Sequence, residues 1–274
     1  MTTAGEAIRA AADRLAPVSD TARLDAELLM AHLFGVTRSE LFLRHMRDPA
    51  PPGFAALVER RFSHEPVAYI TGRQEFYGLP LHVTPATLIP RGDSETLVEA
   101  ALAARPDARR VLDCGTGSGA LLLAVLACLR EAQGVGIDRS HEALAVAAGN
   151  AEQLGLRPQA SFAPGDWHAP GWAEGLGTFD LVLCNPPYVE ETAALDRQVR
   201  DFEPASALFA GPEGLDDYRI LIPQLRALMN EAAIAILEIG ANQADAVSAL
   251  AAASGFTAEL RRDLAGRPRA LILK

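Results

Sequence analysis

The four residues Asn185-Pro186-Pro187-Tyr188 offer the most specific chemistry in the chain. They directly follow Phe179–Cys184, an apolar run typical of a buried strand, and two prolines cannot continue such a strand. We expect the prolines to hold a rigid turn at the carboxyl end of the strand, the edge where α/β sheets bind ligands. There the Asn185 side-chain oxygen and the Pro186 carbonyl could accept hydrogen bonds from an NH2 group, while Tyr188 stacks on a planar substrate group.

This arrangement suits a planar nitrogen, and an amide nitrogen above all, because the lone pair of an amide is delocalised into its carbonyl. Two acceptors on its N–H groups would orient the nitrogen and favour charge build-up on it as a new bond forms. Neither a metal nor a strong base is required, since the proton can leave afterwards. By itself the motif fits a glutamine amide, an adenine amine or a proline-stiffened turn.

A glycine-rich segment, Gly115-Thr116-Gly117-Ser118-Gly119, lies between the strand-like run 110–114 and an apolar helix. Glycine lets the backbone bend sharply and approach a ligand without a side chain in the way. Asp138 ends the next strand-like run, where a carboxylate could accept both hydroxyls of a ribose. The spacing also fits a nicotinamide dinucleotide site, and glycines here could serve helix packing alone.

The elements that position these motifs follow an alternating pattern. Apolar strand-like runs alternate with helical segments from Val111 onward, which predicts a mostly parallel sheet covered by helices. We expect seven strands, near residues 110–114, 133–138, 159–163, 179–184, 233–238, 257–262 and 269–273.

The first third of the chain predicts a small helical bundle. Helices are expected at 5–15, then after an Asp20 cap as far as Gly35, after the Thr37 and Glu40 capping box, and over 54–62. Next come the β-prone pairs Tyr69-Ile70 and Phe76-Tyr77 and the run Leu81-His82-Val83, separated by Gly72 and by Gly78-Leu79-Pro80. We therefore divide the chain into a helical domain at 1–65, a linking hairpin at 66–90 and a catalytic domain at 91–274.

The amino-acid composition argues against several classes of function. The chain has 274 residues, of which 49% are hydrophobic and 22% charged, as in a folded globular protein. Its net charge of −10 argues against a broad nucleic-acid surface, so we expect no direct nucleic-acid binding. The three cysteines lack metal-site spacing, and the apolar run Ala120–Leu129 is too short to span a membrane. Residues 1–6 lack a secretory pattern, so we expect a cytoplasmic protein without metal or membrane.

Together these motifs resemble the protein-glutamine N5-methyltransferases, most closely the branch that acts on peptide chain release factors. The resemblance runs along nearly the whole chain. It extends to further segments: Pro66–Gly72, Glu75–Gly78, Leu88–Arg91, Glu203-Pro204 with Ala207-Leu208, Gly214-Leu215 with Tyr218-Arg219, and Glu238–Gly240 with Gln243. Such an ordered set is far more specific than the four-residue motif alone.

The resemblance implies a class I S-adenosylmethionine-dependent methyltransferase fold, a Rossmann-like, seven-stranded and mostly parallel sheet preceded by a helical bundle and a hairpin. It assigns cofactor binding to Gly115, Thr116, Gly117, Ser118, Gly119, Asp138, Asp166, Trp167 and Asn185. It assigns catalysis to Asn185, Pro186 and Tyr188, and substrate binding to Asn185, Pro186, Pro187 and Tyr188. The product would be S-adenosylhomocysteine.

The resemblance also implies the partner, a class 1 release factor whose Gly-Gly-Gln loop carries the methylated glutamine and which the N-terminal domain helps to recognise. We expect a monomer. A ribosomal-protein glutamine methyltransferase, a nucleic-acid adenine methyltransferase and a non-catalytic protein that only binds release factors are the alternatives. The acidic charge and the helical N-terminal domain speak against the adenine enzyme.

One departure from the family concerns the loop Pro90–Glu95, where Gly92 replaces the family's usual proline. We expect more loop flexibility and no loss of activity. Asp93 or Ser94 is expected to cap the helix that follows. Near the last strand, Arg267 and Arg269 could meet an acidic partner, although solvated charges are the default expectation.

Overall fold

The computed structural model describes residues 2–274, which form two compact units. Among these, the smaller unit comprises residues 2–73 and Leu195–Phe202, and the larger one comprises Gln74–Ala194 and Glu203–Lys274. In this division the first unit runs to Arg73, whereas the sequence placed boundaries at 65 and 90.

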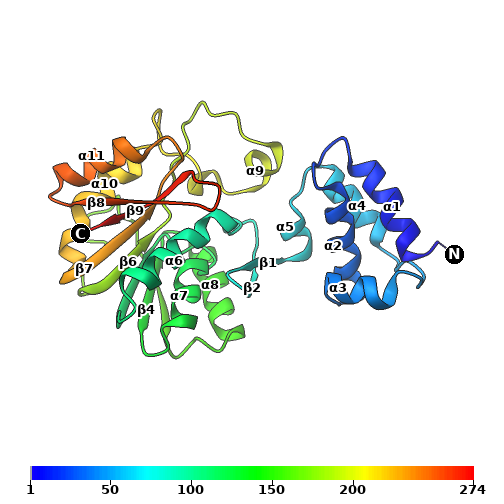
Figure 1. Ribbon diagram of the computed structural model, residues 1–274, viewed down its shortest axis with the longest axis horizontal. Helices are drawn as coiled ribbons and strands as arrows, with labels where there is room; N and C mark the ends of the chain where they lie inside the picture. The colour runs from blue at the N-terminus through cyan, green and yellow to red at the C-terminus, as the bar shows by residue number, and fades with distance from the viewer. Residues whose placement is uncertain (1) are drawn as a thin grey trace. The chain divides into compact units, whose positions relative to one another are not determined.

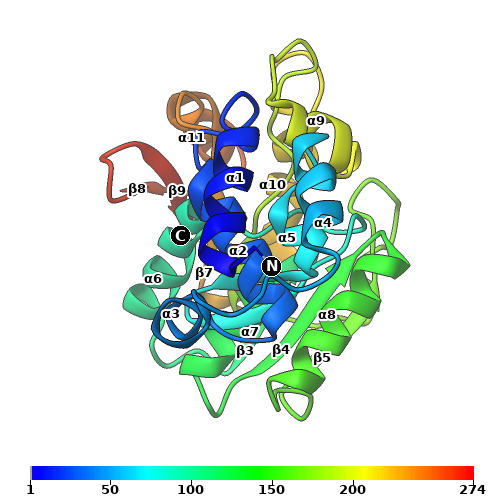
Figure 2. The ribbon, with the colours of Figure 1, turned by 90° about the vertical axis from the view of Figure 1, so that its right-hand side faces the viewer.

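The smaller unit is helical (Figure 2). Its helices are α1 (Ala4–Leu15), α2 (Ala22–Phe34), α3 (Arg38–Glu40) continued by the π-helix η1 (Leu41–His45), α4 (Phe54–Phe62), α5 (Val67–Thr71) and α9 (Arg197–Phe202). Helices α1, α2 and α4 pack on one another around a core of buried apolar side chains that includes Ile8, Leu29 and Val58. This confirms the expected helical bundle.

Local signals set the helix ends in this unit. The capping box at Thr37 and Glu40 is present, and Gly35, with φ of 66°, ends α2 in the left-handed conformation as predicted. The predicted Asp20 cap is wrong, because Thr21 holds the N-cap position and makes no side-chain cap hydrogen bond. The expected β character of Tyr69-Ile70 is also wrong, since both residues lie in α5 and are buried. Packing of Ile70 into the helical core overrides its strand propensity.

A two-stranded hairpin, β1 (Arg73–Phe76) and β2 (Leu79–His82), precedes the main sheet. Its two-residue turn has φ of 51° at Tyr77 and 74° at Gly78, the positive values that a tight hairpin requires. The strand therefore resumes at Leu79, earlier than predicted. Asn150 of α8 accepts from the His82 N–H at 2.7 Å and donates to the Ser118 carbonyl at 2.9 Å, which ties the hairpin to the glycine-rich turn.

The main sheet has seven strands in the order β5-β4-β3-β6-β7-β9-β8, with β9 antiparallel to both of its neighbours (Figure 1). The strands are β3 (Arg110–Cys114), β4 (Gln133–Asp138), β5 (Ala160–Pro164), β6 (Phe179–Cys184), β7 (Met229–Glu238), β8 (Ala258–Arg262) and β9 (Pro268–Leu273). All seven predicted strands are confirmed, although β7 begins at Met229 and not at residue 233.

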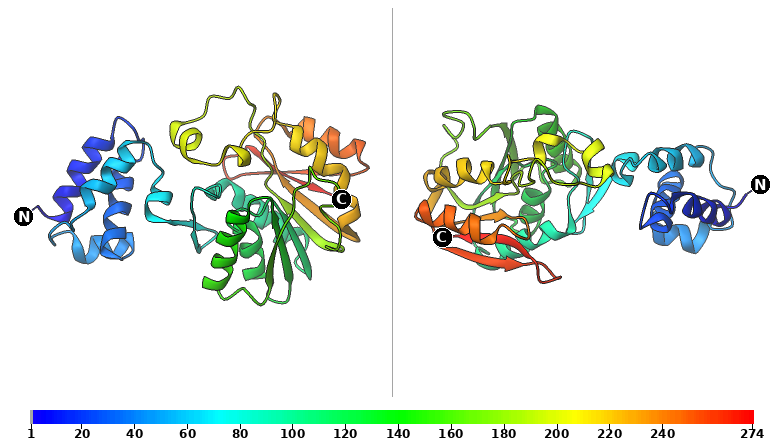
Figure 3. Two further views of the ribbon diagram at one scale, coloured as in Figure 1. Left: turned by 180° about the vertical axis from the view of Figure 1, so that it is seen from behind. Right: turned by 90° about the horizontal axis from the view of Figure 1, so that it is seen from above.

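Helices cover both faces of this sheet (Figures 1 and 3). Helices α6 (Glu95–Ala104), α7 (Ala120–Cys128) and α8 (His141–Gln153) contribute to the core on one face, and α10 (Asp216–Leu225) and α11 (Ala244–Ala253) to the core on the other. Three short 3-10 turns complete the unit: η2 (Gly92–Ser94), η3 (Ala205–Ala207) and η4 (Arg226–Leu228). Among residues 2–274, no helix has both the length and the apolar character needed to cross a bilayer.

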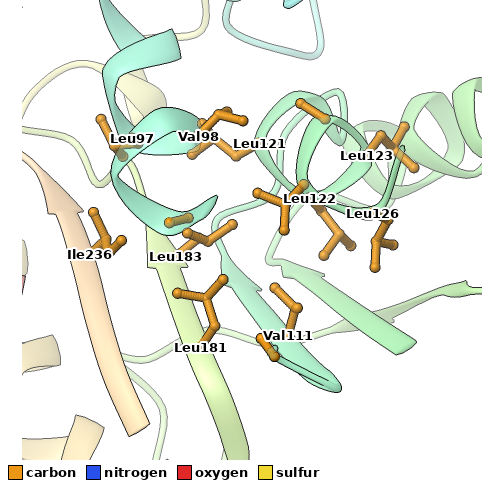
Figure 4. Close-up of a cluster of buried hydrophobic side chains, with 14 of the residues drawn as sticks. Leu97, Val98, Val111, Leu121, Leu122, Leu123, Leu126, Leu181, Leu183 and Ile236 are labelled. Atoms are coloured by element: carbon orange, nitrogen blue, oxygen red, sulfur yellow. The ribbon is translucent and has the colours of Figure 1, made fainter. Parts of the chain in front are cut away.

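Successive side chains of the central strands point to opposite faces of the sheet, so the hydrophobic core is divided between the two faces. Val111, Leu181 and Leu183 pack against α6 and α7 in Figure 4, whereas Leu112 and Val182 join the cluster beneath α10 and α11. These side chains are almost completely buried, and each such burial is worth about 1.5–3 kcal/mol. The apolar strands thus anchor the sheet and leave their carboxyl ends to carry polar groups.

Candidate active site

A cavity opens at the carboxyl ends of β3, β4 and β6, all within the larger unit. Its volume is about 1030 Å³, counting the open mouth. Of the residues predicted from the sequence, it is lined by Gly115, Thr116, Gly117, Ser118, Asp138, Asp166, Trp167, Asn185 and Pro187. Gly119, Pro186 and Tyr188 belong to the same motifs but do not line it. The sheet register explains this convergence, because Cys114 pairs with Cys184 and so sets Gly115 beside Asn185.

The glycine-rich turn uses left-handed backbone at Gly115, Gly117 and Gly119, with φ of 73°, 55° and 83°. A Cβ on Gly115 would lie 3.1 Å from the Trp167 ring. One on Gly119 would lie 3.1 Å from Leu123 Cδ1, so that glycine serves packing of the helix that follows. Gly117 has open space instead, and there the backbone itself faces the cavity.

Asp138 stands at the end of β4, as predicted. Its Oδ2 accepts from the Gly117 N–H at 2.9 Å, and its Oδ1 accepts from the Ser140 N–H at 2.9 Å. Each carboxylate oxygen has two lone pairs, so both oxygens can still accept from a ligand. The geometry therefore fits recognition of a pair of hydroxyls.

Asp113 is a cavity residue that the sequence analysis missed. Its Oδ2 accepts from the Thr116 hydroxyl at 2.7 Å, while its buried Oδ1 has no hydrogen-bond partner within the described chain. Burial raises the pKa of this carboxyl to about 7. An acidic residue within the apolar run Val111–Cys114, just before the glycines, was the signal that could have revealed it. A cationic group in the cavity would satisfy the free oxygen.

Trp167 is oriented by a second acidic residue absent from the sequence predictions, Asp217 of α10. The Trp167 indole N–H donates to Asp217 Oδ1 at 2.8 Å, and His168 Nε2 lies 3.0 Å from the same oxygen. Asp166 Oδ1 accepts from the His168 N–H at 3.0 Å, which fixes the turn. These contacts hold a flat aromatic side chain at the cavity wall.

Asn185 directly follows β6 and is half-buried in the cavity wall. Among the described residues, none hydrogen-bonds to its side-chain amide, and no donor reaches the carbonyl oxygen of Pro186. Both prolines of the motif are buried. The turn therefore leaves the Asn185 amide free at the cavity wall, whereas the unpaired Pro186 carbonyl belongs to a residue that does not line the cavity.

Tyr188 turns its hydroxyl toward the protein interior. It donates to Glu238 Oε1 at 3.0 Å, and burial together with the Glu238 carboxyl raises the pKa of Tyr188. Since the ring does not line the cavity, its stacking on a substrate stays a prediction.

Two further segments close the cavity wall. Glu203, almost fully buried, accepts from the Ile89 N–H at 3.2 Å and pairs with Arg91, while Arg139 Nη2 donates to the Ser206 carbonyl at 2.9 Å. The family-like segments around Arg91 and Glu203 thus bind each other across the cavity rim.

The loop that carries Gly92 corrects two expectations. Ser94 holds the N-cap position of α6 in helical conformation and makes no cap hydrogen bond, so the predicted capping is wrong. Asp93 instead accepts from Arg269 Nη2 at 2.8 Å and from Arg267 Nη2 at 3.3 Å. Arg269 is therefore buried in an ion pair, and the expectation of a solvated charge is wrong.

A metal site in a protein is built from several His, Cys, Asp or Glu side chains that meet around one point. Within the part of the chain that the structure describes, no three such side chains gather closely enough to hold an ion.

Comparison with known proteins agrees with this geometry. Residues 6–72 match the PrmC N-terminal domain family, and residues 106–213 match a methyltransferase domain family. The match favours a methyl donor over the nicotinamide interpretation of the glycine-rich turn. A methyltransferase from Pyrococcus furiosus shares the fold, with a TM-score of 0.51 at 15% identity over 72% of this chain and 88% of that one.

Curated relatives extend the likeness to the whole chain. The release factor glutamine methyltransferase of Rhodospirillum rubrum is 41% identical over 92% of this chain and 78% of its own length. That of Caulobacter vibrioides is 41% identical over 96% of this chain and 93% of its own length. The resemblance seen in the sequence is confirmed, and the chain belongs to the family of release factor glutamine methyltransferases.

Proposed function

We propose that the protein transfers a methyl group from S-adenosylmethionine to the side-chain nitrogen of the glutamine in the Gly-Gly-Gln loop of class 1 release factors. The observation that carries this proposal is the unpartnered amide of Asn185 beside the glycine-rich turn, in one cavity. The names of the relatives support the choice of a glutamine amide as acceptor.

The cavity fits the chemical groups of S-adenosylmethionine. The free Oδ1 of Asp113 suits its ammonium group, the Asp138 carboxylate its ribose hydroxyls, and Asp166 and Trp167 the adenine. When bound, the cofactor supplies a methyl carbon attached to a positively charged sulfur, and S-adenosylhomocysteine is the product.

The chain's own residues prepare the acceptor. Asn185 Oδ1 and the Pro186 carbonyl accept from the two amide N–H groups, which orients the nitrogen lone pair and stabilises positive charge on nitrogen. The nitrogen–carbon bond forms as the carbon–sulfur bond breaks, and the extra proton then leaves to water. The buried prolines keep the two acceptors fixed while the charge develops.

The same proposal covers the partner and its recognition. We assign binding of the release factor body to the N-terminal helical unit, whose residues match the PrmC N-terminal domain family. The enzyme would act as a monomer in the cytoplasm, without a metal ion, a membrane or direct contact with nucleic acid.

Incubation with S-adenosylmethionine carrying a labelled methyl group and purified release factor tests the function. Label should appear on the Gly-Gly-Gln glutamine by peptide mass spectrometry, and a release factor with that glutamine replaced by glutamate should stay unlabelled. Ribosomal proteins are added to the same reaction as competing substrates. An enzyme that is folded and binds the cofactor, yet labels only a ribosomal protein or nothing, would overturn the proposal.

A further inference from the structure

The segment Glu238-Ile239-Gly240, with Gln243, has no part in the function described so far. Glu238 ends β7, the neighbour of β6 on the side opposite the glycine-rich turn. Its side chain is 1% exposed. The segment therefore lies against the back of the Asn185–Tyr188 turn and does not line the cavity.

Glu238 binds the side-chain hydroxyl of Tyr188, and Gln243 binds its backbone carbonyl. Glu238 Oε1 accepts from the Tyr188 hydroxyl at 3.0 Å, and Gln243 Nε2 donates to the Tyr188 carbonyl at 3.0 Å. Gln243 Nε2 also donates to the Gly214 carbonyl at 3.1 Å, and its Oε1 accepts from the Gly240 N–H at 2.9 Å. Every polar atom of the Gln243 side chain is thus engaged in fixing backbone near Tyr188.

Packing reinforces this hold. A Cβ on Gly214 would lie only 2.3 Å from the Tyr188 carbonyl oxygen, so the two backbones touch. The buried Tyr218 hydroxyl donates to the Glu238 backbone carbonyl at 2.7 Å, which fixes the carboxylate-bearing residue itself. Tyr188 consequently has little freedom to move relative to the end of β7.

The carboxyl of Glu238 is costly to bury. Its Oε2 accepts no hydrogen bond of good geometry from the described residues. Burial raises its pKa, while the hydroxyls of Ser94 and Tyr188 and the charge of Arg269 oppose that shift. Arg269 in turn pairs with Asp93. An incompletely paired buried carboxyl destabilises a fold, and the hydrogen bond from Tyr188 gives this carboxyl a role that offsets the cost.

We propose that Glu238 and Gln243 are positioning residues that fix Tyr188 from opposite ends and thereby set the Asn185 and Pro186 acceptors against the substrate amide. The effect on turnover rests on the proposed function. Catalytic acceptors must be held to within about 0.5 Å, and a turn of four residues needs such outside support.

Kinetics with release factor as substrate test the proposal. Tyr188→Phe and Glu238→Ala should each lower kcat about tenfold, the equivalent of one hydrogen bond, and the double variant should be no slower than either. Glu238→Gln keeps an acceptor oxygen and should stay within about threefold of the wild type. KM for the release factor and calorimetric cofactor affinity should not change. Additive losses, or a loss in cofactor affinity equal to the loss in kcat, would overturn the proposal.

A measurement without substrate separates this inference from the proposed function. The chain has four tyrosines, so NMR of protein with 13C at the tyrosine Cζ should give few signals, and Tyr188→Phe identifies the Tyr188 signal. Glu238→Gln should shift that signal and Gln243→Ala should broaden it. An unchanged Tyr188 signal in both variants contradicts the inference even where release factor is methylated. A shifted signal in an enzyme that labels no release factor contradicts only the function.

Discussion

The two halves of the cavity are built in different ways. Most of the cofactor half comes from residues 113–138, with Asp113 in β3, the glycine-rich turn after it and Asp138 at the end of β4, and there backbone conformation does most of the positioning. Its Trp167 wall, by contrast, is held from a distance by Asp217. The acceptor half presents the side chain of Asn185 from a turn whose Tyr188 is bound by residues far along the chain, Glu238 and Gln243. Cofactor binding should therefore depend mainly on the conformation of the local backbone, and catalysis on contacts between residues that are distant in the sequence.

The largest effect that would separate the two halves is expected at Asn185. Asn185→Ala removes one of the two acceptors for the substrate amide, and losing one such preorganised group lowers kcat by about 10²–10³-fold. Cofactor affinity, measured by calorimetry, should change little because the glycine-rich turn and Asp138 remain. Asn242→Ala, at an exposed asparagine beyond β7, is the matched control. Wild-type turnover in Asn185→Ala would contradict the assignment of catalysis to the acceptor half of the cavity.

The cofactor half should instead respond to pH through Asp113. Burial raises the pKa of this carboxyl to about 7, so it is ionised above pH 7 and protonated below. A cationic ligand group binds the ionised form, so affinity should be highest above pH 7 and fall as the pH drops through 7. Between pH 8 and pH 6 the loss should be about tenfold, by calorimetry.

Asp113→Asn provides the control for this pH dependence. The variant should bind the cofactor more weakly at pH 8 and lose most of the pH dependence between 8 and 6. Were it to keep the wild-type profile, another group would be responsible and the assignment of Asp113 to a cationic ligand would be wrong.

A smaller effect is expected from Gly117→Ala. The residue has φ of 55°, and an alanine there is strained by about 1 kcal/mol, which corresponds to about a fivefold loss of cofactor affinity if the turn relaxes away from the ligand. Gly155→Ala carries the same left-handed strain, with φ of 70° and nothing within 4 Å of its Cβ, but lies outside the cavity. It should lower the melting temperature to a similar degree and leave cofactor affinity unchanged. Equal losses of cofactor affinity in both variants would mean that the loss comes from general destabilisation of the fold and not from the glycine-rich turn.

The comparison also explains how much the sequence could predict. The central strands were found because apolar runs such as 179–184 end at glycines, prolines or polar residues, and the glycine-rich turn needs φ values that glycine adopts readily. Both signals are local. The capping box at Thr37 was predicted for the same reason.

Of the features that were missed, Asp113 carried a local signal in the sequence, whereas the others depend on contacts between distant segments. Asp217 contacts Trp167, and Arg269 forms an ion pair with Asp93, and no local pattern in the sequence predicts either contact. Tyr69-Ile70 was assigned to the wrong structure because packing against the helical core outweighs strand propensity. In the acceptor half the motif itself is evident from the sequence, but the residues that hold it are not.

The smallest expected effect concerns the loop Pro90–Glu95, which contributes to the cavity wall and in which Gly92→Pro restores the residue usual in the family. Gly92 begins the 3-10 turn η2, and Arg91 before it is extended, with φ of −102° and ψ of 142°, which a following proline requires. Within the described chain, the Gly92 N–H makes no hydrogen bond, and nothing lies within 4 Å of the position that a Cβ would take there. Proline should thus stabilise the protein by about 0.4–1 kcal/mol, by restricting the unfolded chain.

Chemical denaturation of Gly92→Pro and Gly92→Ala measures this effect. Alanine should give a smaller gain than proline, since it restricts the unfolded chain less. Turnover should stay within about twofold in both, because the Asp93 and Arg269 ion pair and the Glu203 contacts hold the loop already. A loss of turnover with a gain in stability would instead mean that the acceptor half needs this loop to move, and that its long-range support includes flexibility.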